Sequence, residues 1–228
     1  MPAKQPAKVL VACPHCGHKQ AEPRSAFSSV CKKCGQHLRI EEILRPKPKA
    51  EQTAPERRRV TCFECGTELE VALSAESTMC KRCSRYVDLH DYHITSTVSK
   101  NFKTKGSFVL EQKGYLLNTE AVVGDAVIKG RLFGKLTAQK SLTIYSSAEI
   151  KGTFSAARLV IPAANHFRWP TPIKTGSAEI AGELAANLDV AGTLVLKSTA
   201  RLFGDVAAKN MVVEAGAVVV GRARIGGR

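Results

Sequence analysis

Eight cysteines form four Cys-x-x-Cys pairs, and all of them lie before residue 84 of the 228-residue chain. In each of two successive segments, fourteen residues separate one pair from the next. A tetrahedral zinc site needs four soft ligands at about 2.3 Å, and two tight turns with this spacing can supply four thiolates. We predict two metal sites with these ligands: Cys13, Cys16, Cys31 and Cys34 in the first, and Cys62, Cys65, Cys80 and Cys83 in the second.

Closed sites of this kind leave no open coordination position, so we expect two structural zinc ions rather than catalytic ones. Glycine follows the second cysteine of three pairs, where a knuckle turn favours positive φ, and serine takes this place in the fourth. These residues are Gly17, Gly35, Gly66 and Ser84. Disulfides and redox pairs are the alternatives. Residues 1–12 lack the apolar run of a signal peptide, and the cysteine pairs lack a βαβ context, so we favour neither.

The elements that must hold these ligands are duplicated. The first module (9–44) and the second (60–93) align at an offset of 49 residues. Each module ends in a short alternating strand, whose apolar residues are Leu38, Ile40, Val87 and Leu89. A module of this size buries little apolar surface, so bound metal must supply part of its folding free energy. Both modules resemble zinc ribbons or rubredoxin-like knuckles.

Between the modules, residues 45–59 are rich in proline and charge and are predicted to form an extended, mobile tether. The chain has no apolar segment long enough to span a membrane, and we expect a cytoplasmic protein. Its formal net charge of +14 makes nucleic acid a possible partner. The charge is spread thinly, however, and few aromatic residues stand beside basic ones for stacking. A nucleic-acid-binding zinc-ribbon protein on an oligomeric β-helix is therefore an alternative that we do not favour.

The region 106–226 is free of cysteine and repeats itself. Leu142, Leu194 and Met211 each begin an 11-residue phrase of alternating apolar residues, small residues and a closing glycine. A unit of about 17–18 residues can wind once around as three short strands. Apolar residues six apart would then form one interior column, as do Leu184, Val190, Leu196 and Leu202. The pattern predicts a mostly β fold, a parallel β-helix, in preference to a β-sandwich, which would have no fixed coil length.

Two phrases resemble the bactofilin family, over roughly residues 106–226: Leu194-Val-Leu-Lys-Ser-Thr-Ala-Arg-Leu-Phe-Gly-Asp-Val206 and Val212-Val-Glu-Ala-Gly-Ala217. The resemblance implies a right-handed β-helix that polymerises into bacterial cytoskeletal filaments without nucleotide. It also implies a scaffold for cell shape, cell-wall enzymes or chromosome-linked proteins. The two cysteine modules stand where family members carry a short tail, and we expect them to recruit a protein client. No paired carboxylates, nucleophile elbow or phosphate-binding loop is present, so we predict no catalytic residues and no enzyme.

Self-association is also expected from the solenoid itself. A terminal coil without a polar cap exposes unpaired backbone groups over open apolar core, and another subunit is the natural cover. Contacts at both ends would give unbounded stacking and hence a filament. The predicted contact residues are Phe108, Leu110 and Leu116 in the first coil, and Val213, Val219 and Ile225 in the last.

The stretch 165–177 is expected to be an insertion into the repeat. It contains the only tryptophan of the chain, and His166, Phe167, Arg168 and Trp169 are candidates for a partner-binding loop. In the alternative interpretation, the two aromatic residues fold back over the coil surface. The histidine also suggests hexapeptide-type acyltransferases, whose left-handed β-helices use a histidine base. A lone loop histidine without a coenzyme pocket is weak support for that enzymatic alternative.

Overall fold

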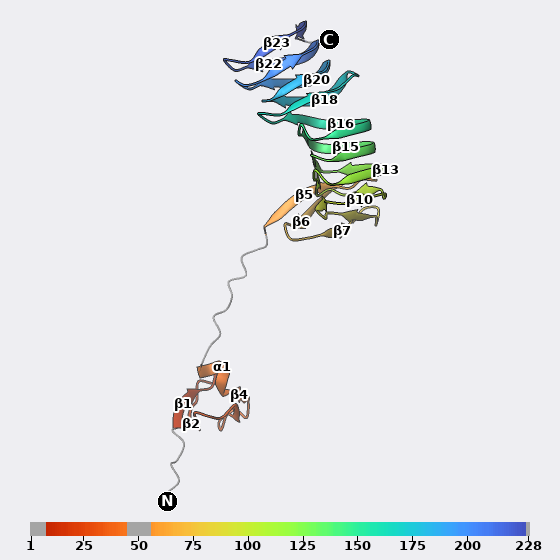
Figure 1. Cartoon of the computed structure of the whole chain (residues 1–228). Helices are drawn as coiled ribbons and strands as arrows, with labels where there is room; N and C mark the ends of the chain where they lie inside the picture. Colours follow the sequence, from red (N-terminus) through yellow and green to blue (C-terminus); the bar gives the residue numbers. More distant parts are fainter. Residues whose placement is uncertain (1–7, 45–55, 227–228) are drawn as a thin grey trace, which may run out of the picture. The chain divides into compact units, whose positions relative to one another are not determined.

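The computed structural model describes residues 8–44 and 56–226 of the chain. These residues are mostly strand, and the only helix among them is α1 (Ile40–Leu44), which is too short to cross a membrane. The chain divides into two compact units, residues 1–55 and residues 56–228 (Figure 1). The first cysteine module is therefore a separate unit, whereas the second belongs to the same unit as the repeat. Most of the expected tether, residues 45–55, lies outside the described residues.

Each cysteine module consists of two antiparallel hairpins. The strands of the first module are β1 (Lys8–Ala12) with β2 (Lys19–Pro23), and β3 (Ser28–Val30) with β4 (His37–Arg39). Those of the second are β5 (Arg57–Thr61) with β6 (Glu68–Ala72), and β7 (Ser77–Met79) with β8 (Tyr86–Asp88). The four apolar residues predicted at the module ends are buried, as expected for a small core: Leu38, Ile40, Val87 and Leu89.

The second unit continues from β8 into a parallel β-solenoid of about eight turns. Its first strands are β9 (Tyr92–Ile94), β10 (Thr97–Val98), β11 (Phe102–Lys103), β12 (Ser107–Leu110), β13 (Tyr115–Val123), β14 (Asp125–Ile128), β15 (Arg131–Ile144) and β16 (Glu149–Ile161). The remaining strands are β17 (His166–Arg168), β18 (Ile173–Ile180), β19 (Glu183–Ala185), β20 (Leu188–Leu196), β21 (Arg201–Phe203), β22 (Val206–Val213), β23 (Val218–Val220) and β24 (Ala223–Ile225).

The strand register confirms the predicted phase of the repeat. Leu142 pairs with Leu159 in the next coil, and Leu194 pairs with Met211. The residues of the predicted interior column are at most 2% exposed: Leu184, Val190, Leu196 and Leu202. Each coil therefore buries its apolar residues against its neighbours, as a solenoid must.

The solenoid begins one coil before the predicted boundary at residue 106. β9 pairs in parallel with β12, and β10 and β11 both pair with β13. Most residues of this first coil are polar or charged, and Ile94, Val98 and Phe102 are its apolar contribution to the core. The alternation that marks the later coils is therefore weak here, which is why the sequence pattern does not reveal it.

The expected insertion at 165–177 is instead part of a regular coil. β17 pairs with β19, and Ala178 pairs with both Leu159 and Leu194, so Ala178 begins the next coil. Pro170 and Pro172 lie between β17 and β18. Because proline has no N–H, neither residue can donate a ladder hydrogen bond to a neighbouring coil.

On one face of the solenoid, the strand pairing is interrupted between β16 and β17. β16 pairs with β15 from Glu149 to Val160, but with β18 only from Ala156 onward. Residues 149–155 thus have no strand partner on their C-terminal side in the described part of the chain. β17, β19, β21 and β23 form a separate four-stranded sheet beyond the division. Three aromatic rings at this level pack on one another, with centroids 4.8–6.2 Å apart: those of Phe154, Phe167 and Trp169.

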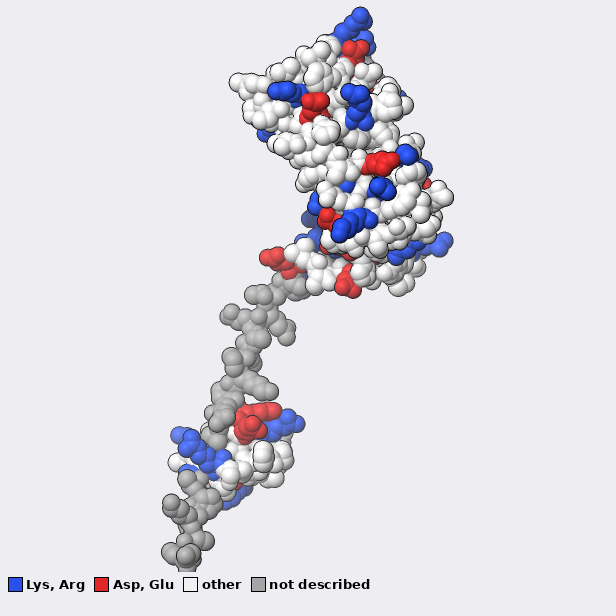
Figure 2. Space-filling view, viewed as in Figure 1, with Lys and Arg blue, Asp and Glu red and all other residues white. Residues whose placement is uncertain are grey.

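Charged side chains of both signs are mixed over the face of the solenoid that Figure 2 shows. The tight basic cluster of the sequence, Arg57–Arg59, lies on β5. Arg57 and Arg59 each have a nitrogen 3.8 Å from a carboxylate oxygen of Glu70, on the paired strand β6. The cluster is therefore partly balanced by acidic charge, which weakens it as a binding site for phosphate groups.

Candidate metal centres and self-association surface

The structure brings the eight cysteines together in the two predicted groups of four. Within each group, the four Sγ atoms lie within 4.8 Å of one another. The Sγ–Sγ distances Cys13–Cys34 and Cys16–Cys31 are both 3.7 Å. In the second group, the corresponding distances are 3.6 and 3.5 Å. Four sulfurs placed about 2.3 Å from a central zinc ion are separated by about 3.8 Å, so both groups fit a tetrahedral thiolate site.

The backbone conformation of each knuckle explains why glycine, or in one case serine, follows its second cysteine. Gly17, Gly35 and Gly66 have φ values of 70°, 70° and 68°, and Ser84 has 56°. The N–H of each of these residues donates to the carbonyl oxygen of the first cysteine of its pair, at 2.8–3.2 Å. This turn places the two thiols of a pair on the same side of the chain, so the predicted need for positive φ is confirmed.

Hydrogen bonds favour the thiolate at some of the cysteines, whereas burial and the neighbouring thiols raise the pKa of Cys34 and Cys83 to about 12. The backbone N–H of Cys34 is the main cause that lowers the pKa of Cys31 to about 6. The side chain of Thr67, whose Oγ1 lies 3.2 Å from Cys65 Sγ, lowers the pKa of Cys65 to about 6. Because metals bind the thiolate form, these contacts prepare the sites for a metal at neutral pH.

The second metal site lies directly against the solenoid. Phe63 and Glu64 form the centre of the first knuckle in this module, and Lys103 and Lys105 belong to the first coil. Lys103 Nζ is 2.6 Å from Glu64 Oε1, and this contact lowers the pKa of the carboxyl. Lys105 Nζ lies 4.1 Å from the centroid of the Phe63 ring and donates to Thr61 Oγ1 at 3.0 Å. Burial lowers the pKa of Lys105.

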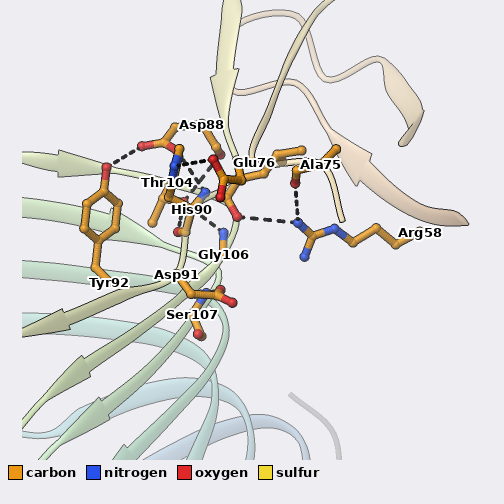
Figure 3. Close-up of polar contacts among 11 residues, drawn as sticks. Arg58, Ala75, Glu76, Asp88, His90, Asp91, Tyr92, Thr104, Gly106 and Ser107 are labelled. Carbon is orange, nitrogen blue, oxygen red and sulfur yellow. Dashed lines mark hydrogen bonds and ion pairs between the residues drawn. The ribbon is translucent and has the colours of Figure 1, made fainter. Parts of the chain in front are cut away.

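A second polar network joins the end of the module to the first coil (Figure 3). His90 Nδ1 lies 3.0 Å from Asp88 Oδ1, and its Nε2 lies 3.1 Å from Glu76 Oε2. The hydrogen bond with Asp88 is the main cause that raises the pKa of His90. The Tyr92 hydroxyl donates to the second oxygen of Asp88 at 2.7 Å. The fully buried Thr104 donates through Oγ1 to the His90 carbonyl oxygen at 2.7 Å.

No motif in the sequence singles out Lys103 or Lys105, because the first coil resembles a polar linker. The signal that could have found their partners is the divergence between the two modules. Thr61, Phe63 and Glu64 differ from the residues that occupy the same positions of the first copy, although the cysteines around them are unchanged. Many other positions also differ between the copies, so this signal becomes specific only once the structure shows the contact.

The predicted contact residues near the start of the repeat lie inside the molecule. Phe108, Leu110 and Leu116 are fully buried, because another coil precedes them. The ring of Phe102 in that coil meets Phe108 edge to face, with centroids 5.1 Å apart. The prediction that these three residues form a self-contact surface is corrected accordingly: they belong to the continuous core.

The last described coil, in contrast, exposes apolar residues to solvent. Val213 and Ile225 are 51% and 46% exposed, and Val219 is partly buried against the core. Val212, Val218 and Val220 beside them are also exposed. β23 and β24 are the last strands of their sheets, with no further strand beyond them in the described residues. All three predicted C-terminal contact residues thus lie on an open, apolar edge.

The four residues proposed for a partner-binding loop lie on or directly after β17. Phe167 is 8% exposed and Trp169 is partly buried, and both pack against the core together with Phe154. The Trp169 ring centroid is 4.8 Å from that of Phe154. His166 and Arg168 are exposed on the surface of the strand. The aromatic pair therefore contributes to the core, and the exposed part of this segment is polar.

A protein-family model described as "Bactofilin: Polymer-forming cytoskeletal" matches residues 86–169 and 168–224. The match begins in β8 and extends into β24, so it includes the first coil that the sequence pattern does not reveal. No curated protein and no solved structure matches the chain.

Proposed function

The chain belongs to the bactofilin family of polymer-forming cytoskeletal proteins, and on this premise we propose that it is a non-enzymatic scaffold that self-assembles without nucleotide. The matched region is the solenoid, which makes up more than half of the chain. In this proposal, the solenoid forms the polymer, and the cysteine modules hold structural zinc ions and recruit client proteins to it.

The observation that carries this proposal is the exposed apolar edge of the last described coil. A terminal β-coil presents a row of unpaired N–H and C=O groups, which a second copy can pair. The same contact would remove Val212, Val213 and Val220 from water. Contact between two identical edges is self-complementary and joins two subunits, so a polymer also needs a second contact elsewhere on the subunit.

We test self-assembly by replacing Val213 with arginine and examining the purified chain by sedimentation and electron microscopy without nucleotide. Val213 is half exposed, so the substitution leaves the core intact and places a charge on the contact surface. The wild-type chain is expected to form large assemblies and the variant to remain in small soluble species. The control is Leu73→Arg, at an equally exposed apolar residue of the second module. Assemblies of wild-type size from Val213→Arg would contradict the proposed contact.

We assign the recruitment of clients to the first module. It exposes three apolar side chains, those of Leu10, Phe27 and Val30, which are 72%, 80% and 53% exposed. Exposed apolar residues of this kind are typical anchors for a protein partner. Proteins that co-sediment with the wild-type polymer should be lost with Phe27→Ser. An unchanged set of co-sedimenting proteins would show that the first module is not the recruiting surface.

A further inference from the structure

The second cysteine module is continuous with the first coil of the solenoid, and we infer that its bound metal makes it a cap on that coil. The first module has no such role. The inference rests on metal occupancy of the second site, which is part of the proposed function. It goes further because it gives the two copies of one module different tasks, one structural for the solenoid and one free for partners.

The chain passes from the module into the solenoid through residues that belong to both. Leu89 is 2% exposed and packs in the core of the module, yet β9 begins only a few residues later. Arg58 of β5 donates through Nη2 to the carbonyl oxygen of Leu89 at 3.4 Å. On the solenoid side, the N–H of Lys105 donates to the carbonyl oxygen of Asp88 at 2.9 Å, and Asp88 forms a parallel β-bridge with Thr104.

The first coil, which is joined to the module, buries its apolar residues more completely than the last described coil does. Ile94 and Phe102 of the first coil are 8% and 4% exposed, whereas Val213 and Ile225 of the last described coil are about half exposed. The Phe102 ring also lies 5.0 Å from that of Tyr92, and Tyr92 is held by its hydrogen bond to Asp88. The two ends of the repeat therefore differ in burial, and the better buried end is the one that is joined to a module.

Electrostatics links this contact to the metal. Four thiolates around a divalent ion carry a net charge of about −2. Lys103 and Lys105 place two ammonium groups against the knuckle that supplies two of these thiolates. Ligation also fixes the turn that holds Phe63 and Glu64 against the lysines, because a small module of this kind folds only with its metal. Loading the site with metal thus strengthens docking both by charge and by shape.

The first module lacks the residues that make this contact. Three positions of the second module touch the lysines: Thr61, Phe63 and Glu64. At the offset of 49, the same positions of the first module are Ala12, Pro14 and His15. None of these supplies a hydroxyl, a benzene ring or a carboxylate to an ammonium group. The first module, accordingly, forms a compact unit of its own.

The test uses hydrogen–deuterium exchange of the full chain, loaded with zinc, followed by mass spectrometry of peptides from residues 92–123. Two matched variants each remove one metal site, Cys62→Ser with Cys65→Ser, and Cys13→Ser with Cys16→Ser. In the second-site variant, exchange in this region should accelerate about tenfold or more, since the first coil opens when its cover is lost. In the first-site variant it should not change. Equal exchange in both variants would overturn the cap.

Loss of metal also unfolds the module, so a second set of variants leaves all cysteines in place. Glu64→Lys should accelerate exchange in residues 92–123 with both zinc ions retained, and Lys103→Glu in the same chain should restore protection. His15→Lys, the matched change in the first module, should have no effect. Unchanged exchange in Glu64→Lys, or failure of Lys103→Glu to rescue it, overturns the cap. Zinc analysis of the same samples separates this result from a failure of the proposed function: a wild-type chain without zinc disproves the metal sites themselves.

Discussion

At the scale of single residues, the two metal sites offer matched substitutions, because each ligand of one module has a counterpart in the other. Cys31 and Cys80 are the buried third ligands of their groups. Both sites have four thiolates and no other nearby ligand in the described residues, so loss of one thiolate leaves an incomplete tetrahedron.

We expect Cys31→Ser and Cys80→Ser each to reduce bound zinc from two ions to one per chain, and the double variant to bind none. Zinc binding supplies on the order of 10 kcal/mol to the folding of comparable small modules, so the affected module should unfold. Native mass spectrometry measures the number of ions. Two ions retained by either single variant would contradict four-cysteine coordination.

His90 gives the joint between the second module and the solenoid a pH dependence. Its pKa is raised above the ordinary value of 6.5, first by the hydrogen bond with Asp88 and also by the charges of Asp88 and Glu76. Tyr92, with its ring centroid 6.3 Å away, completes the groups that face the imidazole. A raised pKa means that the folded chain favours the protonated ring. The stabilisation is fully present below pH 6.5 and is lost as pH rises through the raised pKa.

The corresponding prediction compares the wild-type chain with His90→Gln in thermal unfolding between pH 6 and 8.5. The wild type should unfold at a higher temperature than the variant at pH 6, and the difference should shrink toward pH 8.5. Both chains share the same metal sites, so metal loss at low pH affects them equally. His166→Gln, at an exposed histidine of β17, is the control. A difference that is constant over this pH range would exclude the assigned role of His90.

At the scale of elements, the solenoid depends on interior columns of apolar residues. Leu159 is fully buried and pairs with Leu142 on one side and Ala178 on the other. We expect Leu159→Ala to lower the free energy of unfolding by about 3 kcal/mol, through lost burial and the cavity left behind. Thr153→Ala, at an exposed position of the same strand, should change it by less than about 0.5 kcal/mol. Urea unfolding followed by circular dichroism measures both, and a loss below about 1 kcal/mol in Leu159→Ala would contradict the column.

The repeat could be predicted where alternation is strong, and this covers most of the coils. The first coil escaped prediction because Ile94, Val98 and Phe102 are isolated among polar residues and show no period of two. The coil through β17 is expected to be an insertion because the repeat is longer here: Ala178, the partner of Leu159, follows it by 19 residues rather than 17. In this coil, aromatic rings complete the core, and their positions in the sequence do not follow the spacing of the repeat. Both errors concern single coils, and neither disturbs the phase of the repeat.

At the scale of the whole molecule, the cysteine spacing predicts two metal sites but not the different surroundings of the two modules. The contact of the second module with the solenoid depends on Glu64, Lys103 and Lys105, which are ordinary surface residue types far apart in the chain. Only the folded chain brings them together. The same holds for the difference between the two ends of the solenoid, since the first coil is joined to a module that the sequence pattern treats as independent.

The divided face of the solenoid has a mechanical consequence. A stack of coils resists flexing through the hydrogen bonds that tie neighbouring coils on each face. Beside residues 149–155 these ties are missing on one face, and the rings of Phe154, Phe167 and Trp169 stand in their place. Contacts between rings are weak individually and have no fixed direction, so they yield to shear more easily than aligned hydrogen bonds. In a fibre of such subunits, this level would be a point of low stiffness within each subunit.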